Sequence, residues 1–268
     1  MRFELNLSKM PAWQDDEKVQ YILKADDDFI RLNQLIGRQI TIEFLNEKYC
    51  SNCGNKFADL FRMGFCKNCF FTSPQAGESI IRPELSQAHL DIEDRDLAFE
   101  KSYQLQEHIV YLANGGDLKV GVTRAQQMQN RWIDQGASEA IVLARTENRF
   151  QAGEMEVALK GLMGDKTPWR KMLKNEIPTI DLVKEKLKVK ESLSAEMLEF
   201  FAAGEDEVYQ FNYPVEEWPT KISTLNLDKE AKAEAVLKGV RGQYLIFQGD
   251  LVFNVRAHTG FRVSFAFA

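Results

Sequence analysis

The sequence predicts an α+β protein in three parts, and three observations support this prediction. Segments of alternating apolar and polar residues lie near both ends of the chain, as in strands with one buried face. All four cysteines fall within residues 50–69, as two C-x-x-C pairs. Between the two β-rich ends, the pattern changes to strand, strand, helix, strand, helix. We therefore predict an N-terminal β unit (1–100) containing a zinc ribbon (about 46–74), a central β-β-α-β-α domain (101–192) and a C-terminal β-rich unit (193–268).

Length and composition limit the class of protein. The 268 residues carry 34 Lys and Arg against 40 Asp and Glu, a net charge of -6, and 44% are hydrophobic. This composition excludes disordered and collagen-like chains, and the length suits two or three small domains. No apolar run approaches the roughly 18 residues of a membrane span. The N-terminal residues contain no signal-peptide core, so we expect a cytoplasmic protein without membrane partners.

The N-terminal part contains short β-rich runs at residues 3–7, 20–24 and 40–44, with an acidic turn at Asp26-Asp27-Asp28. Residues 74–101 are polar and contain Pro74 and Pro83, which we interpret as a connector. The C-terminal part begins with a predicted amphipathic helix. Its predicted elements are that helix at 194–202 and strands at 242–247, 251–255 and 262–265.

The four cysteines have the spacing of a metal site. Cys50 and Cys53 form one pair, Cys66 and Cys69 form the other, and twelve residues separate the pairs. A disulfide framework and a redox C-x-x-C are the alternatives, but two such pairs are typical of tetrahedral zinc. Four thiolates leave no position for a catalytic water, so the predicted role is structural. We predict strands at 38–44 and at Phe70-Phe71 on either side, and a ribbon that binds nucleic acid, binds protein or supports a neighbouring domain.

The central domain begins with a predicted hairpin. Strands at 108–113 and 118–122 flank the turn Asn114-Gly115-Gly116-Asp117. A helix at 125–135 ending before Gly136, a strand at 140–144 and a helix at 152–163 follow.

Polar residues of these elements suit phosphodiester chemistry. The hairpin offers Tyr111 and Lys119, the first helix offers Arg131, and the second offers Glu154 or Glu156. A phenol can move a proton, an arginine can neutralise a phosphate and a carboxylate can hold a divalent cation. The two glutamates face different directions on a helix, and we select Glu156. The alternative is that Tyr111 packs in the core and that Arg131 and Arg124 are ordinary surface charges.

These residues resemble the GIY-YIG nuclease superfamily. Ile109-Val110-Tyr111 stands in the place of G-I-Y, and Lys119-Val120-Gly121 in the place of Y-I-G. The resemblance implies a β-β-α-β-α fold and a catalytic set of Tyr111, Lys119, Arg131 and Glu156, with Mg²⁺ at Glu156. Ile109 and Lys119 depart from the motif, and a lysine does not readily relay protons at neutral pH.

A second resemblance covers most of the chain. The four-cysteine ribbon, Lys119-Val-Gly-Val-Thr-Arg124 and Arg131-Trp-Ile-Asp-Gln-Gly-Ala137 are similar to a bacterial family of unassigned function. The same resemblance extends to Asn148-Arg149 and to Ala152-Gly-Glu-Met-Glu156. No reaction follows from it.

Charge is distributed unevenly along the chain. Residues 160–190 hold nine Lys and Arg against four acids, with Trp169 beside Arg170 and Lys171, a pattern that suits contact with a nucleic-acid backbone. His89, His108 and His258 are isolated in the sequence, and we assign them no role. We expect a protein that binds DNA, RNA or a protein partner with weak or no catalysis. The alternative is a divalent-metal-dependent endonuclease.

Overall fold

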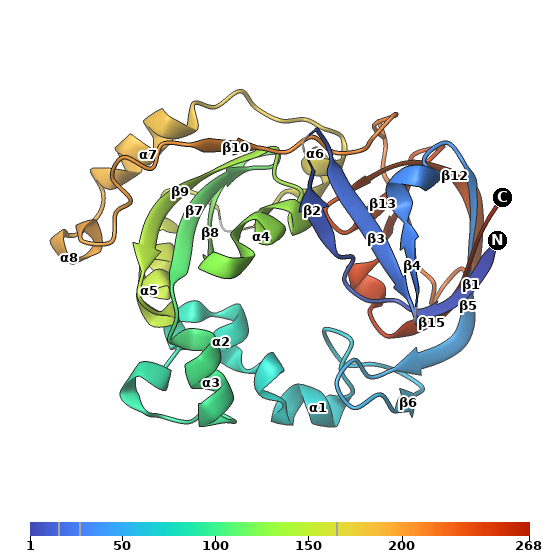
Figure 1. Cartoon of the computed structure of the whole chain (residues 1–268), viewed down its shortest axis with the longest axis horizontal. Helices are drawn as coiled ribbons and strands as arrows, with labels where there is room; N and C mark the ends of the chain where they lie inside the picture. The colour runs from blue at the N-terminus through green and yellow to red at the C-terminus, as the bar shows by residue number, and fades with distance from the viewer. Residues whose placement is uncertain (16, 27, 165) are drawn as a thin grey trace. The chain divides into compact units, whose positions relative to one another are not determined.

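The computed structural model describes residues 1–15, 17–26, 28–164 and 166–268, and the chain forms two compact units. Unit 1 contains Met1–Phe71, Leu173–Asn175 and Phe211–Ala268, and unit 2 contains Thr72–Met172 and Glu176–Gln210. Helices and strands occur together, as Figure 1 shows along the chain. The predicted α+β class is confirmed.

The larger sheet belongs to unit 1. Its strands are ordered β1-β15-β5-β12-β13-β14-β11, and β6 pairs with β5. Every pairing in it is antiparallel except β11 with β14. The strand bounds are β1 Arg2–Asn6, β5 Gln39–Tyr49, β6 Lys56–Phe57, β11 Ser223–Leu225, β12 Lys232–Arg241, β13 Tyr244–Phe247, β14 Leu251–Asn254 and β15 Phe261–Phe267. A second sheet of β2 (Ala12–Gln14), β3 (Val19–Ala25) and β4 (Asp28–Arg31) completes the strands of the unit.

Strands from the two ends of the chain pair directly in unit 1. Arg2 of β1 lies opposite Ala266 of β15, and Glu43 of β5 lies opposite Lys232 of β12. The three predicted parts are therefore grouped differently in the structure, because N-terminal and C-terminal strands share one sheet. Pairing across more than 180 residues leaves no local signal in a sequence. Of the predicted acidic turn at residues 26–28, Asp26 follows β3, Asp28 begins β4 and Asp27 lies outside the described residues.

Unit 2 is built on a four-stranded sheet with the order β10-β9-β7-β8. Its core includes Val110 and Leu112 from β7, with Met155 and Leu159 from α5. The strands are β7 His108–Asn114, β8 Leu118–Arg124, β9 Glu139–Thr146 and β10 Val208–Gln210. The helices are α2 Glu78–Ile81, α3 Leu97–Gln104, α4 Met128–Asp134, α5 Arg149–Leu159, α6 Trp169–Leu173, α7 Leu182–Lys190 and α8 Ala195–Leu198. Helix α1 (Lys67–Thr72) crosses the boundary between the units in sequence, and α6 ends just past a second boundary.

The order β7, β8, α4, β9, α5 agrees with the predicted β-β-α-β-α order. Some helix boundaries differ from the predicted ones, because capping residues determine where a helix begins and ends. Helix α5 begins at Arg149, three residues before the predicted start, because the Asn148 side chain accepts a hydrogen bond from the Gln151 backbone N–H. Gly136 stops the preceding helix at a positive φ of 70°. The predicted helix at 194–202 is limited to α8 (Ala195–Leu198).

The segment predicted as a connector is folded against α5. Residues 74–101 contain α2, three short 3₁₀ turns and most of α3. Arg149 fastens the segment, because its guanidinium donates to the carbonyl oxygens of Ser79 and Ile80, both at 2.8 Å. A Cβ on Gly153 would overlap the backbone of Pro83 and Glu84. Glycine at 153 is therefore what allows this close approach.

Among the described residues, no helix is long and apolar enough to cross a membrane.

Candidate metal centre and cationic site

The four cysteines come together at one end of β5. Cys50 directly follows the strand, Cys53 lies in the next turn, Cys66 precedes α1 and Cys69 lies within it. Their sulfur atoms all lie within 4.8 Å of one another. Three of the cysteines are buried, and Cys53 is exposed. Four sulfurs at this separation could hold one metal ion, as the spacing predicts.

Amide groups donate hydrogen bonds to two of the sulfurs, those of Cys50 and Cys69. The backbone N–H of Cys66 donates to the sulfur of Cys50 at 3.2 Å, and the Asn52 amide donates to the sulfur of Cys69 at 3.4 Å. Burial raises the pKa of the Cys50 thiol, but hydrogen bonds from the Cys53, Cys66 and Asn52 backbone outweigh this effect and lower it to about 6. The Asn52 amide lowers the pKa of the Cys69 thiol, but burial and hydrogen bonds with Cys66, Cys53 and Cys50 outweigh this effect and raise it to about 12. Because metal ions bind the thiolate, Cys50 is the one of these two cysteines whose surroundings favour a bound cation.

The surroundings of the metal centre differ from the predicted ribbon on one side. The predicted strand ahead of Cys50 is present as β5, and it pairs with β6 in a hairpin. The predicted strand at Phe70-Phe71 is instead part of helix α1. The Phe70 backbone N–H donates to the Cys66 carbonyl at 2.9 Å, so the second cysteine pair begins a helical turn.

Tyr111 is completely buried in β7. Its ring lies across the neighbouring strand β8, where a Cβ on Gly121 would come within 2.5 Å of the Tyr111 hydroxyl oxygen. The Trp132 ring of α4 packs against it edge-on, with ring centres 5.7 Å apart. Glycine at 121 is therefore required for the position of this phenol.

Two of the predicted site residues bind the same acceptor. The Tyr111 hydroxyl donates to Gln135 Oε1 at 2.8 Å, and the buried Lys119 ammonium donates to the same oxygen. Burial raises the pKa of the Tyr111 phenol, and a hydrogen bond and positive charge from Arg131 offset this only in part. The phenol is therefore protonated at neutral pH and already engaged.

Of the two candidate glutamates, Glu156 lies near Tyr111 and Glu154 points to solvent. Glu156 is 9% exposed and its charge acts on Tyr111, whereas Glu154 is exposed. Lys160 pairs with Glu156 at 3.6 Å, and the charge of Arg149 acts on it as well. Glu156 is the one carboxylate of the predicted set, and it offers few oxygen ligands, so these residues fit Mg²⁺ poorly.

Further cations lie beside the predicted set. The guanidinium carbon of Arg124 lies 4.3 Å from the centre of the Tyr103 ring, and that of Arg149 lies 5.4 Å from it. Positive charge from Arg124 and Arg131 acts on Arg149, whose pKa burial already lowers. Among the described residues, the buried Nε atoms of Arg124 and Arg131 have no hydrogen-bond partner. We call Lys119, Arg124, Arg131 and Arg149 the cationic site.

The sequence did not lead us to select Gln135. Arg124 was considered as an ordinary surface charge and, like Arg149, as part of a resemblance. A signal for Gln135 exists, because it lies four residues after Arg131 and so projects near it at the end of the helix. Arg149 carries no such signal, since its partners lie about 70 residues earlier in the chain.

His108 is fully buried at the start of β7, with an expected effect on stability. Burial lowers its pKa to about 4, helped by the charges of Arg149 and Arg124 and opposed by the Gln106 carbonyl 2.7 Å from Nδ1. The unfolded chain takes up a proton near pH 6.5 and the folded chain does not. Stability is therefore complete above about pH 6.5 and falls as the pH drops toward 4, by about 2 kcal/mol at pH 5.

Urea unfolding of unit 2 at pH 7.5 and 5 measures this effect. His108→Gln should remove that part of the pH dependence, whereas His89→Gln, at an exposed histidine of the same unit, should keep it. Equal pH dependence in the wild type and His108→Gln would contradict the assignment.

Several lysines of the basic run at 160–190 already have acidic or carbonyl partners within the protein. Lys171 pairs with Asp117, Lys184 with Asp181 and Lys188 with Glu185. Lys186 is fully buried, and its ammonium donates to the carbonyl oxygens of Ala202 and Glu205 and to Asp206. The guanidinium carbon of Arg170 lies 4.2 Å from the centre of the Trp169 ring. Asp165, counted among the acids of this run, lies outside the described residues.

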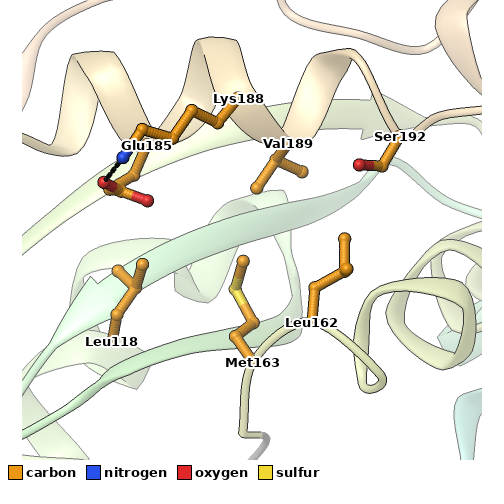
Figure 2. Close-up of a pocket in the computed structure, with 7 residues that line it drawn as sticks. All are labelled: Leu118, Leu162, Met163, Glu185, Lys188, Val189 and Ser192. Atoms are coloured by element: carbon orange, nitrogen blue, oxygen red, sulfur yellow. Dashed lines mark hydrogen bonds and ion pairs between the residues drawn. The ribbon is translucent and has the colours of Figure 1, made fainter.

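Unit 2 also contains a cavity of about 360 Å³. Figure 2 shows Val189 of α7 and Ser192, which follows the end of that helix, on one side, and Leu118, Leu162 and Met163 on the other. Glu185 and Lys188 form an ion pair at its edge. None of the predicted site residues lines this cavity.

Comparison with known proteins places the chain by family. Searches of curated proteins and of solved structures each found no match. A family described as a protein of unknown function, DUF2797, matches residues 37–263. That range begins just before β5, includes the metal centre and all four residues of the cationic site, and ends within β15. Because the match covers most of the sequence, the chain belongs to the DUF2797 family.

Proposed function

We propose that this protein binds nucleic acid through the cationic site and that the site does not cleave it. One observation supports this most strongly: cations gather around Tyr111 and Arg149. Arg131 acts on both Tyr111 and Arg149, Arg124 acts on Arg149, and Lys119 shares the Gln135 oxygen with Tyr111. The buried Nε atoms of Arg124 and Arg131 lack partners among the described residues, and a phosphate would supply acceptors. One guanidinium group can donate two parallel hydrogen bonds to two oxygens of a phosphate, which suits a sugar-phosphate backbone.

Tyr111 and Lys119 both donate hydrogen bonds to Gln135, and this supports binding without catalysis. A phenol that acts as a base must lose its proton, yet burial raises the pKa of Tyr111 and Gln135 accepts its hydrogen bond. Lys119 donates to the same oxygen and is 3% exposed. Reaching a scissile phosphate would require both groups to leave Gln135.

The four cysteines, in this proposal, hold one Zn²⁺ in a closed and therefore structural site. Cysteines that bind Zn²⁺ as thiolates suit a reducing compartment, so the proposal includes a cytoplasmic location.

Binding is tested by fluorescence anisotropy with labelled DNA and RNA, single-stranded and duplex, at several salt concentrations. Arg124→Gln and Arg131→Gln should each weaken binding about tenfold. Each should also reduce the slope of log affinity against log salt concentration by about one, the value for one lost phosphate contact. Arg145→Gln is the matched control, because Arg145 already pairs with Glu205 and Glu107 at 2.8 and 3.1 Å. The pair Arg170→Ala with Lys171→Ala should have a smaller effect than either site variant. Binding that is unchanged in both site variants would contradict the proposal.

Phosphodiester cleavage is the second candidate, favoured by the closeness of Tyr111, Lys119 and Arg131. The same labelled nucleic acids, incubated with Mg²⁺ or Mn²⁺, test it. Our proposal expects no products. Products that vanish in Glu156→Ala and Arg131→Ala would replace it with a nuclease.

A further inference from the structure

Three phenylalanines gather beside the metal centre in unit 1, and we call Phe61, Phe70 and Phe71 the phenylalanine surface. The ring centres of Phe61 and Phe70 are 5.0 Å apart, those of Phe70 and Phe71 are 5.3 Å apart, and those of Phe61 and Phe71 are 5.5 Å apart. Phe61 is 45% exposed and Phe71 is 55% exposed. Large apolar rings that meet solvent in a group mark a binding surface more often than isolated ones do.

Positive charge accompanies these rings. The Arg62 guanidinium carbon lies 5.6 Å from the centre of the Phe61 ring and 6.0 Å from that of Phe70. Lys67 is exposed at the start of α1, the helix that carries Phe70 and Phe71. Among the described residues, neither Arg62 nor Lys67 forms an ion pair, so both charges are available to an anionic partner. The exposed carboxylate of Asp59 is already paired with Lys48 at 2.9 Å.

The rings lie close to the four cysteines along the chain. Phe70 and Phe71 directly follow Cys69, and Phe61 lies five residues before Cys66. The Phe61 N–H donates to the Phe65 carbonyl at 2.7 Å, and the Phe65 N–H donates to the Arg62 carbonyl at 2.9 Å, so a tight turn joins Phe61 to Cys66. A metal bound by the cysteines would therefore hold both halves of the surface together.

We propose that the phenylalanine surface stacks unpaired bases of a single-stranded nucleic acid, with Arg62 and Lys67 contacting its phosphates. This inference rests on the proposed function and names the form of nucleic acid that is preferred. Every base has a face that can stack on an aromatic ring, and a base in a duplex is already stacked on its neighbours. Unpaired cations next to the rings favour a polyanion over an apolar protein segment.

The experiment compares a labelled single strand with a labelled hairpin duplex of equal length, bound to the metal-loaded full chain. Phe61→Ala and Phe71→Ala should each weaken single-strand binding about tenfold and leave duplex binding unchanged. Phe29→Ala is the matched control, because Phe29 is also half-exposed in unit 1 and has Arg31 at 5.5 Å from its ring centre. Metal content must be equal in all variants. Crosslinking with a thiouridine-containing strand should label the peptide that contains Phe71.

The outcomes separate this inference from the proposed function. Duplex binding by the wild type with no added affinity for single strands would overturn the inference and leave the proposed function standing. Equal weakening of single-strand and duplex binding in Phe61→Ala and Phe71→Ala would also overturn it. Wild type that binds neither form at low salt would refute both, and the phenylalanine surface would then suit a protein partner.

Discussion

Removing the metal is expected to unfold the segment around the four cysteines while unit 2 stays folded. Residues 50–66 contain no buried apolar cluster of their own and include a run of exposed side chains from Ser51 to Ala58. A metal ion replaces such a core, and the zinc contribution in small zinc domains is about 10–16 kcal/mol. Protein purified without chelator should contain about one zinc per chain. After chelation, limited proteolysis should cut between residues 50 and 71, and thermal unfolding of unit 2 should persist.

The variant Cys66→Ser should reproduce the effect of chelation, because it removes a buried sulfur from the set. Ser51→Ala is the matched control, since Ser51 is exposed between two of the cysteines and offers no sulfur. Zinc content far below one per chain, or a protease pattern that chelation leaves unchanged, would contradict the assignment.

Replacing Gly153 with alanine is expected to destabilise unit 2 by about 3 kcal/mol or more. In an ordinary helix this change stabilises by up to about 1 kcal/mol, because glycine is the poorer helix former. Here the new Cβ would overlap the backbone of Pro83 and Glu84, which cannot rotate away as a flexible side chain could. The steric cost exceeds the gain in helix propensity, so the sign reverses. Urea unfolding of unit 2 measures the change.

The matched control is Gly161→Ala, where no atom lies within 4 Å of the new Cβ. It should change the stability of unit 2 by less than about 0.5 kcal/mol. If Gly153→Ala unfolded at the same urea concentration as the wild type, the packing of residues 83–84 on α5 would be refuted.

Local patterns predicted the parts of this protein whose determinants lie close in sequence. The spacing of Cys50, Cys53, Cys66 and Cys69 predicted that their sulfurs come close enough to hold one metal ion, and the hairpin signal at residues 114–117 predicted β7 and β8. Each depends on residues within about twenty positions of one another. The order of strands and helices in the central region was predicted for the same reason.

The remaining features depend on partners far away in the chain. Strand β12 was not predicted, because its residues show no clear strand pattern in the sequence. It forms a strand by pairing with β5, which lies about 190 residues earlier in the chain. The polar segment 74–101 looks like a connector until Gly153 and Arg149 provide the surface and the donors that hold it. Gln135 joins the candidate site only because the fold directs Tyr111 and Lys119 to the same oxygen.

The pairing of β1 and β5 with β12 and β15 also determines the order in which the chain can fold during synthesis. Strand β5 has left the ribosome long before β12 and β15, its partners on either side, have been made. All residues of unit 2 emerge before Phe211, where the last segment of unit 1 begins. Because domains fold as they emerge, unit 2 can complete its core while the apolar faces of β1 and β5 still wait for partners. Until β12 and β15 are made, β1 and β5 therefore present unpaired strand edges, which are sites of mispairing in a nascent chain.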